Sequence, residues 1–159
     1  EENLMAAFQS RVSMEDFANR APAVPAALRR LGEAIEASGL DKTLTELVKL
    51  RASQLNHCAF CVQFHLNVLR KLGAEQEKLD LVAVWREAGV FSEREAAALA
   101  WTEALTLSPG HNATDEAYAA LLTQFTEQEA IFLTAAIGLI NAWNRIGVGL
   151  RFAPPVPAR

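Results

Sequence analysis

Helix start and stop signals run along the whole of this chain, and they favour an all-α fold. Capping boxes at 92–95 and 126–129, each a serine or threonine three positions before a glutamate, open two apolar runs. Gly39, Gly73 and Gly89 each follow another helical run, where a left-handed residue ends a helix. No segment alternates polar and apolar residues as a strand does. The sequence therefore predicts helices over about 26–37, 44–55, 57–72, 75–87, 93–107, 115–124 and 130–148.

The helix boundaries predict further details. Asp41 or Thr43 can cap the helix over 44–55, and Asn56 is the expected N-cap of the helix over 57–72. Pro109 and Gly110 predict a turn. At 159 residues one domain is expected. Its parts are an N-terminal arm or short helix over 1–20, a helical domain over 21–152, and a proline-rich tail over 153–159.

Charge and hydropathy narrow the class of protein. The formal net charge is −4, and no basic cluster is present, which argues against nucleic-acid binding. We find no secretory signal and no apolar run of 18 residues for a membrane span. The expected location is the cytoplasm, where a Cys-x2-Cys pair is more often redox-active or metal-binding than a permanent disulfide.

The segment over 131–150 is apolar on nearly every side. Such a helix is covered either by its own domain or by another subunit, and a domain of this size has limited room to surround one. We therefore expect a homo-oligomer. Asn141, Asn144 and Arg145 interrupt the run, and we expect them to form structural hydrogen bonds.

Both cysteines of the chain lie in one short motif, Cys58-x2-Cys61-x3-His65. At about 100° per residue the three side chains fall within about 60° on one helix face. Two thiols at this spacing can close a disulfide, and a histidine one turn later can accept a proton. A structural interpretation also exists, in which two inert thiols lie beside a core histidine. Tetrahedral zinc is a weaker alternative, because no second Cys/His pair is present.

A reactive cysteine needs a lowered thiol pKa, and several residues are candidates for lowering it. Cys58 would gain from the helix dipole if Asn56 capped the helix, and Cys61 would gain from His65. Glu46 can orient the imidazole if the chain bends near 56–57, although Glu46 also fits the third position of a capping box that begins at Thr43. His57 lies at the edge of the cluster and is a candidate relay.

The spacing Glu46-x11-Cys58-x2-Cys61-x3-His65 resembles the signature of the AhpD-like alkylhydroperoxidases, within the carboxymuconolactone decarboxylase superfamily. The segments over 46–56, 85–87, 92–101 and 141–145 also resemble one branch of that family, so the resemblance covers about 21–152. It implies an AhpD-like helical bundle that forms trimers or hexamers.

The resemblance also implies roles for the motif. Cys61 would attack a hydroperoxide and become a sulfenic acid, and Cys58 would resolve it as a disulfide. His65 would be the base for Cys61, and Glu46 would polarise His65. No bound cofactor or metal is implied. The reductant would be an external dithiol, of lipoyl type together with a partner peroxiredoxin in the best-known members.

One position departs from the pattern. Some members carry a second histidine directly before the second cysteine, where this chain has Phe60. The proton path would then be shorter or run through water or His57. Two other functions remain open: a decarboxylase-type enzyme that acts on a lactone acid without redox chemistry, and a redox sensor whose disulfide forms without turnover.

Overall fold

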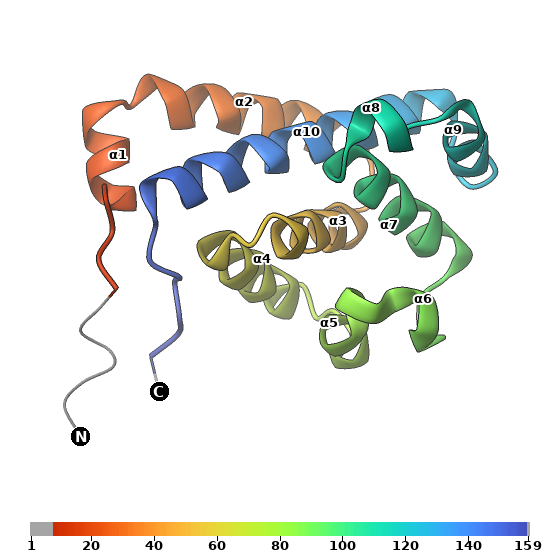
Figure 1. The fold of residues 1–159 in the computed structure, drawn as a ribbon, viewed down its shortest axis with the longest axis horizontal. Helices are drawn as coiled ribbons and strands as arrows, with labels where there is room; N and C mark the ends of the chain where they lie inside the picture. The colour runs from red at the N-terminus through yellow and green to blue at the C-terminus, as the bar shows by residue number, and fades with distance from the viewer. Residues whose placement is uncertain (1–7, 159) are drawn as a thin grey trace.

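The computed structural model describes residues 8–158, which form helices and connecting turns without a strand. The helices are α1 Met14–Arg20, α2 Ala23–Ala37, α3 Lys42–Leu55, α4 Ala59–Lys71, α5 Gln76–Leu81, α6 Trp85–Ala88, α7 Glu93–Thr106, α8 Pro109–Asn112, α9 Asp115–Leu122 and α10 Glu127–Leu150. Figure 1 shows α2 and α10 side by side, with α3 and α4 on one side of them and α9 at one end. The predicted all-α class is confirmed for the described residues.

Helix α3 lies at the centre of the packing and contacts α4, α7 and α10. Its Val48 and Leu50 are fully buried, as is Leu133 of α10. Burying one such side chain contributes about 1.5–3 kcal/mol. Because α3 carries Glu46 and α4 carries both the Cys61 and His65 side chains, this packing also builds the candidate site.

The prediction that Asn56 caps the cysteine helix was wrong. Asn56 ends α3, and Cys58 is the N-cap of α4. Between them His57 takes a left-handed backbone, with φ 55°. The N–H groups of His57 and Cys58 donate to the carbonyls of Gln54 and Ser53, which is a Schellman motif. His57, at a position where glycine is usual, therefore ends α3 and turns the chain into α4.

The helix predicted over 75–87 is interrupted. A 3₁₀ turn at Val82–Val84 separates α5 from α6. Val82 is fully buried and packs with the cluster that contains Leu50 and Leu69. Two β-branched valines lower the helix propensity here, and burial of Val82 fixes the bend. Gly89 ends α6 with φ 67°, as its position predicted.

Several other helices begin at a side-chain cap. Both capping boxes form, at Ser92 and at Thr126, and Thr114 caps α9. Asp41 caps α3 by accepting a hydrogen bond from the Leu44 N–H at 2.8 Å. The capping box considered for Thr43 and Glu46 does not form, because α3 begins earlier than that box requires. The turn predicted at Pro109 is one turn of helix, α8.

Helix α10 begins earlier and ends later than predicted. It is the helix, among the residues described, that is long and apolar enough to cross a membrane by length and composition. The expectation that no such run exists was therefore wrong. This is weak evidence of a span, since central helices of folded domains pass the same test. Here α10 packs against α2, α3, α4 and α7, which buries part of its apolar surface, while Ile131 and Val148 stay exposed.

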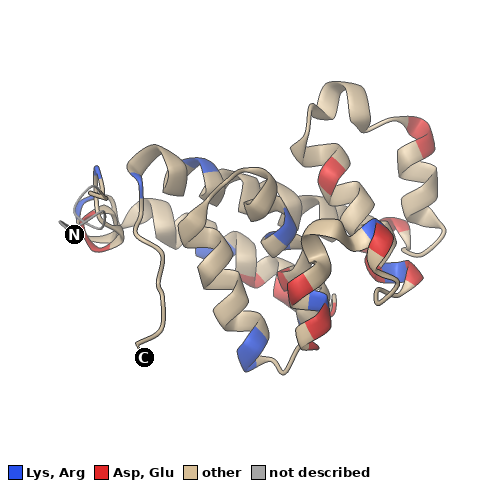
Figure 2. Cartoon of the chain, turned by 60° about the horizontal axis from the view of Figure 1, so that its bottom comes forward, with Lys and Arg blue, Asp and Glu red and all other residues tan. Residues whose placement is uncertain are grey.

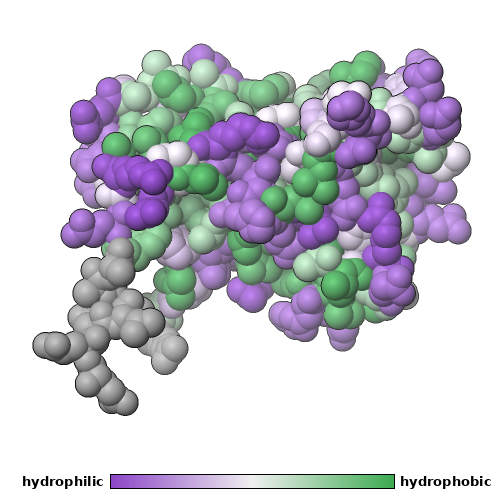
Figure 3. All heavy atoms as spheres, viewed as in Figure 1, coloured by the Kyte–Doolittle hydropathy of each residue, from purple (hydrophilic) through white to green (hydrophobic). Residues whose placement is uncertain are grey.

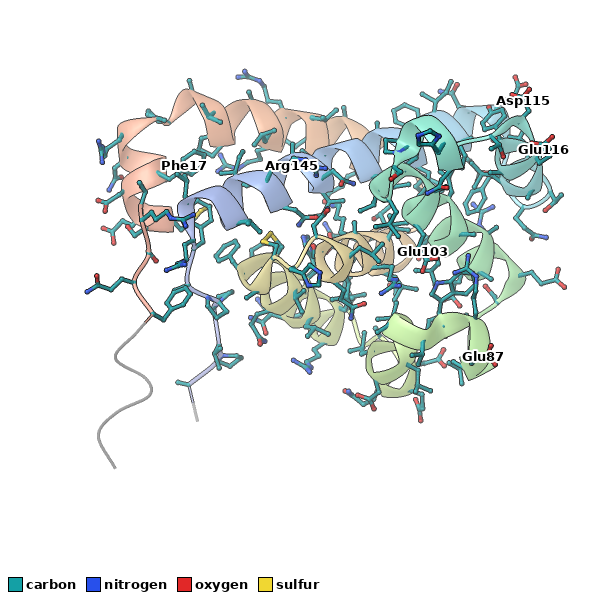
Figure 4. All side chains as sticks on the ribbon, viewed as in Figure 1. Phe17, Glu87, Glu103, Asp115, Glu116 and Arg145 are labelled. Carbon is teal, nitrogen blue, oxygen red and sulfur yellow. A yellow bond between two sulfur atoms is a disulfide. The ribbon has the colours of Figure 1, made fainter. Side chains whose placement is uncertain are left out.

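The segments near the two ends of the described chain contact each other. Phe17 of α1, labelled in Figure 4, is buried, and its ring centroid is 5.6 Å from that of Phe152. Residues 153–158 have no regular structure, although the Asn67 side chain donates to the Pro155 carbonyl at 2.9 Å. Within the predicted N-terminal segment 1–20, residues 14–20 form α1, and 1–7 lie outside the described residues.

Ion pairs and charged hydrogen bonds join several helices. Acidic and basic residues are interspersed along the ribbon in Figure 2. Glu103 of α7, labelled in Figure 4, accepts hydrogen bonds from Arg51 at 3.0 Å and from the Trp85 indole at 2.8 Å, and it pairs with Arg86. One carboxylate thus joins α7 to α3 and α6.

Candidate active site

The two cysteines form a disulfide at the start of α4, with their Cα atoms 5.3 Å apart. Cys58 is 1% exposed and Cys61 is 3% exposed. The sulfur of Cys58 accepts a hydrogen bond from the Cys61 N–H at 3.3 Å, as an N-cap side chain does. Cys61 is the third residue of α4, so its sulfur also lies in the first turn, where the helix dipole favours negative charge.

The reversal at His57 brings Glu46 and His65 together. Glu46 Oε2 lies 2.6 Å from His65 Nδ1, and both side chains are buried. Since the partner is a carboxylate, Nδ1 carries the hydrogen and donates it, which leaves Nε2 to accept a proton. The bend that Glu46 required is therefore present, and the Glu46 carboxylate is hydrogen-bonded to the imidazole.

Glu46 remains ionised although it is buried. Burial by itself raises the pKa of Glu46. The hydrogen bond and charge of His65, together with the ammonium of Lys49, outweigh this effect and lower the pKa below its ordinary value. Lys49 Nζ lies 3.1 Å from Glu46 Oε1. Each carboxylate oxygen thus has its own partner.

A cavity of about 580 Å³ opens beside this group. Cys61, His65, Glu46 and Lys49 all line it, whereas Cys58 and His57 do not. Most of the remaining wall is apolar and includes Pro25, Leu28, Phe60, Phe64, Leu139 and Trp143. A cavity of this size and lining can enclose a small organic molecule.

The structure brings together four of the five residues singled out from the sequence. His57 is exposed in the turn between α3 and α4, outside the cavity wall. Phe60, where some family members have a histidine, packs against Phe64 and Phe152 with centroid distances of 6.0 and 5.4 Å. The third histidine, His111, is exposed in α8.

Helix α10 is hydrogen-bonded to the segment that precedes the disulfide. Asn144 is fully buried and donates to the Ser53 hydroxyl at 3.0 Å, and Asn56 donates to both Asn141 and Asn144 at 2.9 Å. These bonds join α10 to the end of α3, just before the cysteines. The expected structural role of Asn141 and Asn144 is confirmed.

Gly147 of α10 lies directly against the disulfide. A Cβ at this position would lie 2.8 Å from Cys58 Sγ and 3.5 Å from Cys61 Sγ. The sequence analysis missed both Gly147 and Lys49. Lys49 had a signal, because it follows Glu46 by three positions on a predicted helix. Gly147 had none, since only the packing of α10 on α4 shows why a side chain is excluded.

Among the described residues, no group of three or more His, Cys, Asp and Glu side chains is arranged to hold a metal ion. The chemistry available at the site is that of a dithiol, an imidazole and a carboxylate. These groups can form and break a disulfide and move a proton.

Comparison with known proteins assigns the family. The carboxymuconolactone decarboxylase family model matches residues 22–104, more than half of the chain. The chain belongs to the carboxymuconolactone decarboxylase family. The uncharacterized protein YdfG of Bacillus subtilis strain 168 is 35% identical to this family member over 113 residues, which cover 71% of this chain and 77% of YdfG.

Solved structures agree on the AhpD-like fold of this family member. A protein of unknown function from Agrobacterium tumefaciens, described as a candidate antioxidant defence protein AhpD, has a TM-score of 0.87 and 38% identity, covering 94% of this chain and all of that one. The debrominase Bmp8 has a TM-score of 0.78 at 21% identity, over 87% of this chain and 74% of its own. The second likeness shows the fold alone, so function must be argued from the site.

We predict that Gly147→Ala lowers the free energy of unfolding of the oxidised protein by about 1–3 kcal/mol, because the added methyl group overlaps Cys58 Sγ. Gly138→Ala, on the same helix with no atom within 4 Å, is the matched control and should stabilise by about 0.5–1 kcal/mol. Urea unfolding of both variants measures the difference. A Gly147→Ala protein as stable as wild type would contradict the close packing.

Proposed function

We propose that this protein is a thiol-dependent hydroperoxide reductase whose working groups are Cys58, Cys61, His65 and Glu46. The observation that carries the proposal is that Cys61 and the Glu46–His65 pair line one cavity. A dithiol, a base and an orienting carboxylate are the parts that such a reaction needs. The AhpD-like fold and the family membership support the same function.

Access favours Cys61 as the thiol that attacks first. Cys61 lines the cavity with His65, whereas Cys58 lies behind it against Gly147. The helix dipole does not distinguish the two thiols, because Cys58 is the N-cap and Cys61 lies in the first turn, so both thiolates would be stabilised by it. Access from the cavity, whose wall also contains His65, therefore selects Cys61.

The proposed reaction begins with a reduced dithiol. His65 Nε2 accepts the Cys61 proton, and the thiolate attacks the terminal oxygen of the hydroperoxide. The O–O bond breaks and an S–O bond forms. The leaving alkoxide takes the proton that His65 accepted and departs as the alcohol. Cys58 then attacks the Cys61 sulfur, releasing water and closing the disulfide. An external dithiol, such as a dihydrolipoyl group, returns both cysteines to thiols and is itself oxidised to a disulfide.

The cavity supports a substrate with an apolar group next to the peroxide. Phe60 precedes Cys61 in α4 and Phe64 follows it, and both line the cavity. Leu139 and Trp143 line it from α10. An alkyl or aryl hydroperoxide would bury its carbon chain against these residues, which hydrogen peroxide cannot do. The dithiol that this cycle consumes is supplied in a reducing compartment, and we propose the cytoplasm.

Peroxide consumption with a dithiol, followed with cumene hydroperoxide, tests the proposal. Cys61→Ser should abolish turnover, since no thiolate then faces the cavity. His65→Gln should lower turnover by about 100-fold or more through loss of the base. His111→Gln, which changes an exposed histidine in α8, should match wild type.

Three results would overturn the proposal. The first is unchanged turnover in Cys61→Ser. The second is one round of oxidation without steady turnover, which would identify a redox sensor. The third is activity on a lactone acid that survives alkylation of both cysteines, as a decarboxylase of this family would show.

We further propose that the chain forms a homo-oligomer. Ile131 of α10 is 59% exposed and Val148 is 45% exposed, and Leu31 on α2 is exposed as well. Apolar side chains reach the surface among polar ones on the face drawn in Figure 3. A second copy that packed on these side chains would remove them from water.

Light scattering after gel filtration should therefore give three or six times the chain mass of 17.4 kDa. Ile131→Asp should reduce the assembled fraction, whereas Gln128→Asp, at a polar exposed position of α10, should not. A monomeric wild-type protein would refute the proposed assembly.

A further inference from the structure

Lys49 is a charged residue at the site that has no role in the proposed reaction. It follows Glu46 by one turn of α3, and its side chain is only 13% exposed. Its ammonium lies 3.1 Å from Glu46 Oε1, while Glu46 Oε2 lies 2.6 Å from His65 Nδ1. Lys49 also lines the cavity together with Cys61 and His65. One buried carboxylate thus stands between a cation and an imidazole.

We propose that Lys49 is a positioning residue that sets the pH range in which Cys61 is reactive. It holds the Glu46 carboxylate in place through Oε1, so that Oε2 faces His65. It also places a fixed positive charge beside the groups that exchange the thiol proton. This inference rests on the proposed function of Cys61 and His65 as a nucleophile and its base.

The sign of the effect follows from charge alone. His65 can accept the thiol proton only when its Nε2 is free, so a pair in which both groups are protonated must first lose one proton. A neighbouring positive charge favours that loss whether the proton comes from the thiol or from the imidazole. Removing the Lys49 charge therefore moves the reactivity of Cys61 to higher pH. The lowered pKa of Glu46, to which His65 and Lys49 both contribute against the effect of burial, agrees with this arrangement.

Among the described residues, no other lysine or arginine that lines the cavity is bonded to Glu46. Helix α4 presents Phe60 and Phe64 to the cavity, and α10 presents only apolar or aromatic side chains there. The remaining charged residues of the wall lie at its exposed side, on α2 and at the start of α3: Arg29, Glu33, Glu36 and Lys42. Lys42 pairs with Glu36 and not with Glu46. Lys49 is thus the cation bonded to the carboxylate that holds His65.

Lys49 also has a purely structural interpretation. A Glu–Lys pair three positions apart stabilises an isolated helix, and Lys49 could do no more than that. A structural role would change the melting temperature without moving the pH dependence of thiol reactivity. The two interpretations therefore separate in one experiment.

The experiment is alkylation of the reduced full-length protein by iodoacetamide between pH 5 and 10, with Cys61 modification quantified by mass spectrometry. Lys49→Met should move the midpoint of the rate profile up by about 0.5–1 pH unit. Lys49→Arg keeps the charge and should stay near the wild-type midpoint. Lys42→Met, which removes another cation from the same cavity wall, is the matched control and should also stay there.

A Lys49→Met midpoint equal to wild type, or a Lys42→Met shift of the same size, would overturn the inference. Circular dichroism melting of each variant shows whether the fold is retained, and Lys49→Gln gives a second neutral replacement if Lys49→Met does not fold. The assay contains no peroxide. A protein that never turns over hydroperoxides but shows the Lys49 shift would refute the proposed reductase and leave this inference standing.

Discussion

The buried hydrogen bond between Glu46 and His65 is the interaction on which the candidate site depends. A buried carboxylate is costly unless its oxygens have partners, and here His65 takes one oxygen and Lys49 the other. The bond joins α3 to α4, so it also fixes where the imidazole lies relative to Cys61. The same side chains therefore hold the two helices together and form the candidate site. A movement of α3 against α4 would disturb the groups that would handle the thiol proton.

That bond exists only because the chain reverses between the two helices. His57 adopts the left-handed backbone at φ 55°, which costs a non-glycine residue about 1–2 kcal/mol. The Schellman hydrogen bonds at Ser53 and Gln54 offset part of this cost, and α10 secures the turn through Asn144. Helix α10 then approaches the sulfurs closely at Gly147. The long apolar helix thus serves as a platform for the reversal and for the disulfide.

Local signals predicted much of this fold, and the misses have physical causes. Capping boxes and helix-ending glycines act over a few residues, so Ser92, Thr126 and Gly89 were read correctly. A bend near 56–57 was considered only as a condition for Glu46, and the left-handed residue that makes it, His57, was not foreseen because glycine is the usual residue there. The motif spacing predicted Cys58, Cys61 and His65 as a group, and the family resemblance added Glu46. The structure brings the four residues together. Gly147 and the break at Val82 depend on tertiary packing, which no local pattern records.

The central claim is that Cys61, which faces the cavity beside His65, reacts with peroxide before Cys58 does. The most direct measurement is mass spectrometry of the Cys58→Ser variant after treatment with one equivalent of cumene hydroperoxide and a sulfenic-acid trapping reagent. The account predicts a trapped sulfenic acid on Cys61 in that variant and none on Cys58 in the Cys61→Ser variant. A trapped sulfenic acid on Cys58 in Cys61→Ser, with Cys61 unmodified in Cys58→Ser, would contradict it.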